Sequence, residues 1–175
     1  MQQRFTGFSA MFNTLIRRFL LQARSRLKKR FNRTLPFGDY VSDRWEKARF
    51  LGFGENSSIY DSALVFGDVI VGHDVWVGPF TLLDGSGATL KIGDYCHISA
   101  GVQIYTHDTV DLVIQKGEIS KAAINIGDHC YIGPNVVISK GVNIGDHVII
   151  GANSFVNQDI PAHSKAWGTP AQPIA

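Results

Sequence analysis

A parallel β-helix built from six-residue repeats is the fold that the sequence predicts for residues 59–163. Three observations support it: aliphatic residues recur every six positions, glycine directly follows many of them, and a second small or branched residue stands two positions earlier. An α-helix of about 3.6 residues per turn cannot keep a period of six on one face, and hairpin sheets have less regular turns. Three such units close a triangular coil of about 18 residues, and successive coils stack by parallel strand pairing.

The repeat positions form two series separated by one long interruption. They are Ile59, Val65, Val71, Val77, Leu83, Ile92, Ile98 and Ile104, and then Ile126, Ile132, Ile138, Ile144, Ile150 and Val156. Cys96 and Cys130 occupy the earlier inward position of their repeats, so we expect both thiols in the core. Two cysteines at this spacing make neither a disulfide framework nor a CxxC pair, which favours a reducing compartment.

The composition agrees with a single domain that is rich in turns. The 175 residues include 18 glycines and only 18% charged residues, whereas an average globular protein has roughly 25%. Charge is unevenly distributed, because residues 1–50 hold 12 of the 17 Lys and Arg but only 3 of the 15 Asp and Glu. The rest of the chain is acidic. An acidic surface is unfavourable for nucleic acid, so any contact with a polyanion or a membrane is expected at the N-terminal segment.

Residues 1–58 are predicted to form a basic amphipathic helix and a capping segment. Apolar residues recur at steps of three and four, which predicts a helix over residues 8–31. Pro36 ends this pattern, a second helix is expected from about residue 41 to 50, and Gly52 is its expected stop. Two roles are open for the first helix. It covers the open end of the solenoid or packs on a neighbouring subunit, which is the role we favour. Alternatively, it makes a peripheral contact with an anionic membrane. The chain has no evident secretory signal or apolar span, so a cytoplasmic location is expected.

The period fails at two places, and insertions in a repeat protein project from one face, where binding sites are often found. The small break, Asp84 to Thr89, is expected to be a short turn extension. The large break lies between Ile104 and Ile126, which predicts an extended loop over residues 106–123. His107 opens this loop and is thereby distinguished from the other five histidines. On spacing alone, a catalytic histidine and an ordinary loop histidine are equally supported.

The other histidines are expected to be structural. His73, His129 and His147 lie two or three residues after a repeat aliphatic, at turns where a left-handed backbone favours Asn, Asp and His. His129 and His147 are one coil apart, so we expect them to lie one above the other. The spacing of the histidines offers no close pair of ligands, and no metal site is expected.

Three motifs carry a resemblance to a known family. They are Ile104-Tyr105-Thr106-His107, then Ile126-Gly127-Asp128-His129-Cys130-Tyr131-Ile132-Gly133, and finally Asp159-Ile160-Pro161 with Gly168-Thr169-Pro170-Ala171. Over roughly residues 59–172 the chain resembles the hexapeptide-repeat acyltransferases, in particular the sugar O-acetyltransferase branch that includes maltose and galactoside acetyltransferases. It is also similar, from about Pro36 onward, to small acyltransferases of surface-polysaccharide and lipopolysaccharide gene clusters.

The resemblance implies a fold, an activity and an assembly. The expected fold class is all-β, a left-handed parallel β-helix with N-terminal α-helices, a protruding loop and a C-terminal tail over residues 164–175. The expected enzyme is a homotrimeric acetyltransferase with its sites in grooves between subunits. It would transfer an acetyl group from acetyl-CoA to a hydroxyl of a sugar or of a polysaccharide or lipopolysaccharide precursor.

The same resemblance makes His107 the general base, because the family's catalytic histidine opens the same loop after the same Ile-Tyr-Thr sequence. Acyl transfer to a hydroxyl needs a base with a pKa of about 6.5 to 7, which imidazole has without tuning. No Ser or Cys stands in a recognisable nucleophile setting, which favours direct transfer. Asp84 matches an acidic position near the family's acceptor pocket and is a candidate for substrate binding, although an ordinary turn aspartate is equally expected. Asp108 is a weaker candidate for the same role.

The resemblance also places acetyl-CoA along the later coils. The candidate contacts are Tyr131, Gly133, Pro134, Gly151, Ala152, Asn157 and Gln158. Asn157-Gln158 stands where the family tends to have Thr-Lys, and Gln172 stands in place of a basic residue, so two expected phosphate contacts are missing. Lys140 and Lys165 are candidate replacements.

Two alternatives to a sugar O-acetyltransferase stay open. Val77-Gly78-Pro79 stands where the family's acceptor pocket has an asparagine, which argues against maltose or a simple galactoside as acceptor. One alternative is an N-acetyltransferase that acts on an amino sugar. The other is a non-catalytic β-helix scaffold, which the missing phosphate contacts favour.

Overall fold

The computed structural model describes residues 7–174, which divide after Ser42 into two compact units. The first unit contains α1 (Gly7–Phe31) and the single turn α2 (Gly38–Val41). The helix predicted over residues 8–31 is therefore confirmed as α1. The hydroxyl of Tyr40 accepts a hydrogen bond from the backbone N–H of Leu35 at 2.8 Å, which holds the connecting segment against α2.

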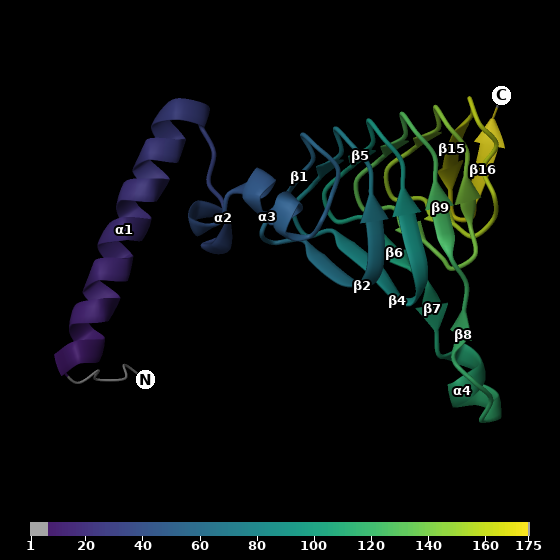
Figure 1. Ribbon diagram of the computed structural model, residues 1–175, viewed down its shortest axis with the longest axis horizontal. Helices are drawn as coiled ribbons and strands as arrows, with labels where there is room; N and C mark the ends of the chain where they lie inside the picture. Colours follow the sequence, from purple (N-terminus) through teal and green to yellow (C-terminus); the bar gives the residue numbers. More distant parts are fainter. Residues whose placement is uncertain (1–6, 175) are drawn as a thin grey trace. The chain divides into compact units, whose positions relative to one another are not determined.

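The second unit begins with α3 (Arg44–Phe50), which covers the first coil of the solenoid (Figure 1). A single helix over residues 41–50 was expected, but the chain is extended at Ser42, and the Asp43 carboxylate caps a new helix by accepting from two backbone N–H groups. Ala48 lies in the core. The ammonium group of Lys47 donates to the carbonyls of residues 60, 61 and 63 at 2.8–3.1 Å, which ties α3 to the coil below it.

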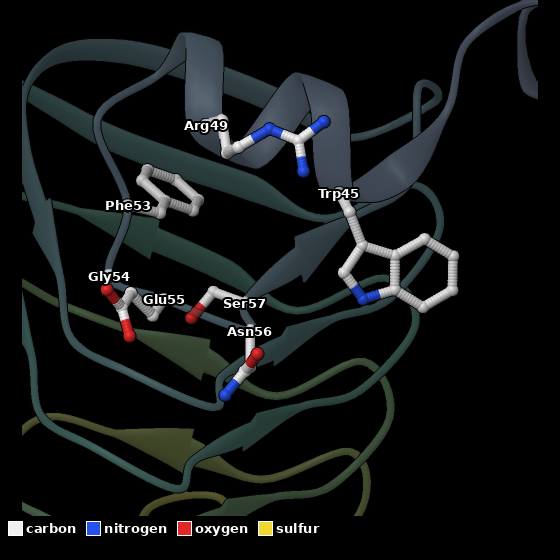
Figure 2. Close-up of a pocket in the computed structure, with 7 residues that line it drawn as sticks. All are labelled: Trp45, Arg49, Phe53, Gly54, Glu55, Asn56 and Ser57. Atoms are coloured by element: carbon white, nitrogen blue, oxygen red, sulfur yellow. The ribbon is translucent and has the colours of Figure 1, made fainter.

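A pocket of about 360 Å³ lies between α3 and the start of the first coil. Figure 2 shows its lining, with Trp45 and Arg49 projecting from α3 and Phe53 to Ser57 from the chain that follows. Gly52, at φ +75°, makes the turn between these two segments, so the expected stop is confirmed.

Most strands are two or three residues long and pair in parallel with the strand one coil away. One sheet runs in the order β1 (Ser58–Ile59), β3 (Trp76–Val77), β5 (His97–Ile98), β10 (Tyr131–Ile132), β13 (Ile149–Ile150), β15 (Lys165–Gly168) and β16 (Ala171–Ile174). A second runs β12 (Asn143–Ile144), β9 (Ile124–Ile126), β4 (Leu82–Ile92), β6 (Gln103–Tyr105), β11 (Val137–Ile138) and β14 (Phe155–Val156), with β2 (Leu64–Val71) paired to β4. The second sheet curls around one corner and supplies two faces of the coil, so a parallel β-helix is confirmed.

The strand register confirms the repeat count. Tyr131 pairs with Ile149, 18 residues later, which is one uninterrupted coil. The separation of the paired residues Trp76 and His97 is three residues longer than one coil. The separation of the paired residues His97 and Tyr131 is sixteen residues longer than one coil. Both expected insertions are therefore present, and neither disturbs the coils on its two sides.

The core consists of the repeat aliphatics. Of the fourteen positions, all but Val65 are buried, and the inward residues two positions earlier are buried except Val69. Cys96 and Cys130 are buried free thiols in neighbouring coils, as expected. The solenoid includes β15, which pairs in parallel with β13, and the chain then turns back as the antiparallel strand β16. The described residues also include four helices, so "all-β" applies to the solenoid and not to the whole chain.

Eight turns of the solenoid share one backbone feature. At each of them, the third residue after an inward aliphatic adopts a left-handed backbone with φ between 55 and 62°. These residues are Asp74, Phe80, Tyr95, His129, Asn135, His147, Asn153 and His163.

One corner of the solenoid carries a column of stacked rings. The rings of His129 and His147 stack at 4.7 Å between centroids, as expected, and Tyr95 and His163 extend the column. His73 differs from the expectation, because Asp74 takes the left-handed position at that turn.

Candidate active site

His107 lies where the chain leaves the coil for the long insertion. Strand β6 ends at Tyr105, and β7 (His107–Asp108) pairs in antiparallel fashion with β8 (Ser120–Lys121). Between them lies α4 (Val110–Gln115), which ends at Lys116 in a left-handed conformation. The insertion is therefore a short hairpin with a helix at its tip (Figure 1), and His107 is the first residue of its first strand.

Asp84 faces His107 from the neighbouring coil. Its Oδ2 atom lies 3.5 Å from Nδ1 of His107, and its carboxylate is buried. The other oxygen, Oδ1, accepts hydrogen bonds from the backbone N–H and the hydroxyl of Ser86. Within residues 7–174, Nδ1 of His107 is the one buried side-chain nitrogen or oxygen without a hydrogen-bond partner. The imidazole therefore turns its buried nitrogen towards a carboxylate, which leaves Nε2 as the nitrogen available to a substrate.

Thr106 joins the two insertions at this corner. Its hydroxyl is fully buried, donates to the carbonyl of Asp84 at 2.8 Å and accepts from the N–H groups of Gly87 and Ala88, each at 3.2 Å. Gly87 allows this close approach, because a Cβ atom there would lie 2.5 Å from Cβ of His107. The small insertion was expected to be a simple turn extension. It lies instead within the long strand β4, with a register shift opposite β2, and it holds the base of the large insertion.

The side chain of Asp108 contacts a different residue from the one that the side chain of His107 contacts. Its Oδ2 atom forms an ion pair with the ammonium of Lys140, and its Oδ1 atom accepts from the N–H of Val110 at 3.0 Å. The hydrogen bond from Lys140, followed by that from Val110, holds the pKa of Asp108 below its ordinary value. This pair connects the hairpin to the coil after β11, so both groups have a structural partner.

A groove of about 460 Å³ lies beside His107. It is lined by Tyr105 at the end of β6, by Val137 and Phe155 on the two succeeding strands of the same sheet, and by His107 to Val110, Ser139 and Lys140. Polar groups are thus gathered at the hairpin end, and apolar side chains line the sheet. The hydroxyl of Ser139 donates to the carbonyl of Val156.

The seven candidate acetyl-CoA contacts lie elsewhere in the chain, and none of them lines this groove. Tyr131 is partly exposed on β10, in the other large sheet, and Gly133 and Pro134 follow at the next corner. Gly151 and Ala152 occupy the same corner one coil later. Asn157 and Gln158 follow β14, and the Gln158 amide donates to the carbonyl of Ala171 at 3.0 Å. Sequence reasoning thus selected His107, Asp84 and Asp108, which the structure brings to one corner, but it did not find the bridging role of Thr106 or Gly87.

No group of three or more His, Cys, Asp or Glu side chains in the part of the chain that the structure describes is placed to hold a metal ion. The stacked histidines of the corner column lie on separate coils and present rings to one another.

Comparison with known proteins identifies the family. The family model described as bacterial transferase hexapeptide (six repeats) matches residues 123–158. The crystal structure of a hexapeptide-repeat-containing acetyltransferase from Vibrio cholerae O1 biovar eltor, in complex with acetyl coenzyme A, is 30% identical to this chain. The alignment covers 98% of this chain and 92% of that one, with a TM-score of 0.54. The chain belongs to the hexapeptide-repeat transferase family.

Other known proteins are similar to part of this chain, and this chain spans less than two thirds of the curated relatives it matches. Carnitine operon protein CaiE from Escherichia coli K12 is 33% identical over 123 residues, which are 66% of this chain and 63% of CaiE. The bifunctional protein GlmU from Syntrophomonas wolfei is 30% identical over 94 residues, 49% of this chain but only 20% of GlmU. AntD, an N-acyltransferase from Bacillus cereus solved with dTDP and coenzyme A, shares the fold with a TM-score of 0.62 at 20% identity, over 74% of this chain and 87% of AntD.

Proposed function

We propose that this protein is a left-handed β-helix acyltransferase that transfers an acetyl group from acetyl-CoA to a hydroxyl of a sugar-like acceptor, with His107 as general base. The observation that carries the proposal is the contact between Nδ1 of His107 and the buried carboxylate of Asp84 at the edge of a groove. A carboxylate at Nδ1 favours the tautomer with a proton on that nitrogen and leaves Nε2 unprotonated to accept one. Asp84 is thus proposed as a positioning residue rather than as the acceptor contact first expected.

The proposed reaction is a direct transfer. The acceptor oxygen attacks the thioester carbonyl carbon while its proton passes to Nε2 of His107. The tetrahedral intermediate then collapses, the carbon–sulfur bond breaks, and the proton passes to the departing thiolate of coenzyme A. An acyl-enzyme is not supported, because Ser139 donates to a backbone carbonyl and both cysteines are buried. The hydrogen bond with Cys130 and burial raise the pKa of the Cys96 thiol, which disfavours the nucleophilic thiolate.

Acetyl-CoA as donor is supported by the Vibrio cholerae relative, whose structure contains it. The contacts proposed for it are Tyr131, Gly133, Pro134, Gly151, Ala152, Asn157 and Gln158. Because these residues lie away from the His107 groove within one chain, we propose that a homotrimer brings this surface of one subunit to the groove of the next. Lys140 is paired with Asp108, so among the two candidate lysines Lys165 is the better replacement for the missing phosphate contacts.

The acceptor is the least defined part of the proposal. A sugar hydroxyl in a polysaccharide or lipopolysaccharide precursor, used in the cytoplasm, agrees with the sequence motifs. An amine acceptor is the second candidate. It is favoured by the fold shared with AntD, an N-acyltransferase whose structure contains dTDP and coenzyme A. A base at Nε2 serves both, since each nucleophile loses one proton on attack.

The test is coenzyme A release from acetyl-CoA in the presence of free sugars, amino sugars, nucleotide sugars and oligosaccharides, with the product mass measured. An increase equal to one acetyl group on an acceptor, lost on treatment with hydroxylamine, identifies an ester and supports the proposal. A product that resists hydroxylamine identifies an amide and selects the second candidate. If acetyl-CoA neither raises the melting temperature of the protein nor reacts with any acceptor, the scaffold alternative holds instead.

A further inference from the structure

The N-terminal half of α1 carries an apolar surface that is largely exposed among the described residues 7–42. Five large side chains are exposed on it, namely Phe8, Met11, Phe12, Leu15 and Phe19, with 43 to 78% of each accessible to solvent. Their spacing places them within about 100° of one another around the helix. Phe8 and Phe12 also stack on each other, with ring centroids 6.4 Å apart. This set is called the apolar stripe below.

The rest of the apolar side of α1 is used within the unit. Leu20, Ala23 and Leu27 are partly buried, and a pocket of about 230 Å³ lies between this part of the helix and the turn α2, with Tyr40 in its lining. This part of the helix therefore has a neighbour within the unit. The apolar stripe begins nearer the N-terminus, and Phe19, its last member, also lines this pocket.

The charge of α1 indicates which kind of partner the apolar stripe fits. Residues 7–33 contain eight Lys and Arg and no Asp or Glu. Six of the eight, from Arg24 to Arg33, follow the apolar stripe along the chain, and all of their side chains are exposed. A surface of exposed Phe and Leu continued by a cluster of cations fits an anionic lipid bilayer, where apolar side chains enter the interface and cations contact the headgroups. Nucleic acid would use the cations but not the apolar stripe.

We propose that α1 lies in the plane of an anionic membrane surface, with the apolar stripe in the interface region and the basic residues 24–33 on lipid headgroups. The helix is about 37 Å long at 1.5 Å per residue. None of the helices within residues 7–174 has the length and hydropathy to cross a bilayer. The proposed contact is therefore peripheral, and it would hold the acyltransferase unit near acceptors at a membrane. It goes beyond acyl transfer and does not depend on it.

The test uses the full chain and vesicles of phosphatidylcholine with or without phosphatidylglycerol. Cosedimentation is expected with the anionic vesicles, to weaken as salt is raised, and to be absent with neutral vesicles. The triple variant Phe8→Ser, Phe12→Ser, Phe19→Ser removes apolar contacts, and Arg24→Gln, Arg26→Gln, Lys28→Gln removes charge. Each set is expected to weaken binding by about tenfold or more. All six side chains are exposed, so folding of the variants is expected to be intact, with circular dichroism as the check.

The matched control is Ile70→Ser on β2, which removes an equally exposed apolar side chain from the other unit and is expected to leave vesicle binding unchanged. Coenzyme A release with a soluble acceptor is expected to be the same in all variants, which separates this proposal from that of acyl transfer. Equal binding to neutral vesicles, or anionic binding that survives both triple variants, overturns the proposal. A loss of oligomer mass in the serine variant by light scattering, without loss of vesicle binding, would assign the apolar stripe to a second copy of the chain instead.

Discussion

Oδ2 of Asp84 lies 3.5 Å from Nδ1 of His107, although the two residues belong to different coils. Each residue opens one of the two insertions in the repeat. The contact therefore forms only because both insertions leave the coil at the same corner.

His107→Ala is expected to lower kcat by about 10²- to 10⁴-fold, because it removes the proposed base, while the KM for acetyl-CoA changes little. Steady-state kinetics with a saturating acceptor measure both values. The control is His129→Asn, which removes a histidine from the corner column and keeps a residue suited to its left-handed φ of 57°. Undiminished turnover in His107→Ala would exclude the role.

Asp84→Asn is expected to lower kcat by about 10- to 100-fold, by analogy with the loss of outer-shell partners of functional histidines. The amide keeps the shape of the side chain but no longer favours the Nδ1–H tautomer. The informative measurement is the ¹⁵N chemical shifts of the His107 ring, which report the tautomer directly. Asp111→Asn in α4 removes a carboxylate from the same insertion and should change neither quantity. An unaltered tautomer in Asp84→Asn would contradict the positioning role.

Gly87→Ala is expected to displace the base of the hairpin. The new methyl group would lie 2.5 Å from Cβ of His107 and 2.8 Å from the carbonyl of Thr106, so the chain must shift. Overpacking of this kind costs about 1–3 kcal/mol, and kcat should fall with it. Gly117→Ala in the same insertion is the control, because its nearest contact would be 3.4 Å. The two variants should differ clearly in the free energy of unfolding, measured with denaturant, and in kcat. Equal values for the two variants would argue against tight packing at this corner.

Ile150→Ala and Ile149→Ala test the solenoid core with two neighbouring residues of β13. Ile150 is fully buried, and its truncation is expected to lower the free energy of unfolding by about 2–5 kcal/mol. Ile149 is 44% exposed on the outer face, so its truncation should cost much less in an isolated subunit. Chemical denaturation of both variants provides the comparison. A larger loss for Ile149→Ala would place that side chain in a subunit interface.

Lys140→Met is expected to raise the pKa of Asp108 towards its ordinary value, since the hydrogen bond from Lys140 is the largest cause of its depression. Because the folded-state pKa lies below the unfolded one, the stabilisation from this pair is present above the unfolded pKa and is lost as pH falls through the folded pKa. Carboxyl ¹³C titration by NMR measures the change. Lys165→Met removes a lysine from another part of the solenoid and should leave the Asp108 titration where it is.

The coils could be predicted from the sequence because every six-residue unit repeats the same local pattern of inward and outward residues. A period of six specifies which residues face inward, and the pairing of Tyr131 with Ile149 follows by counting one coil. The sizes of both insertions could be counted in the same way. The left-handed turns were predicted for His129 and His147 but misplaced at His73, because an aspartate one residue later takes the third position after the aliphatic.

The contacts of the site could be predicted only in part. Asp84 and His107 were selected because they flank the breaks in the period, yet their mutual contact depends on how the β7–β8 hairpin leaves the coil. The pairing of Asp108 with Lys140 has the same origin, since it crosses from the hairpin to a regular coil. A repeat pattern describes the strands it repeats and carries no information about the direction of an inserted segment.

The strand register is kept on both sides of the two insertions, and this bears on how specificity for the proposed acceptor could change. From Ile126 to Val156 the aliphatic positions keep their spacing of six, and a residue added or removed there would shift every later side chain between core and surface. The corner at Asp84 and His107 already absorbs three residues at one level and sixteen at the next without any such shift. Under the proposed function, acceptor preference is therefore expected to change by exchange of this one hairpin between homologous proteins, and chimeras cut at Thr106 and Ala123 should keep the stability of the coils.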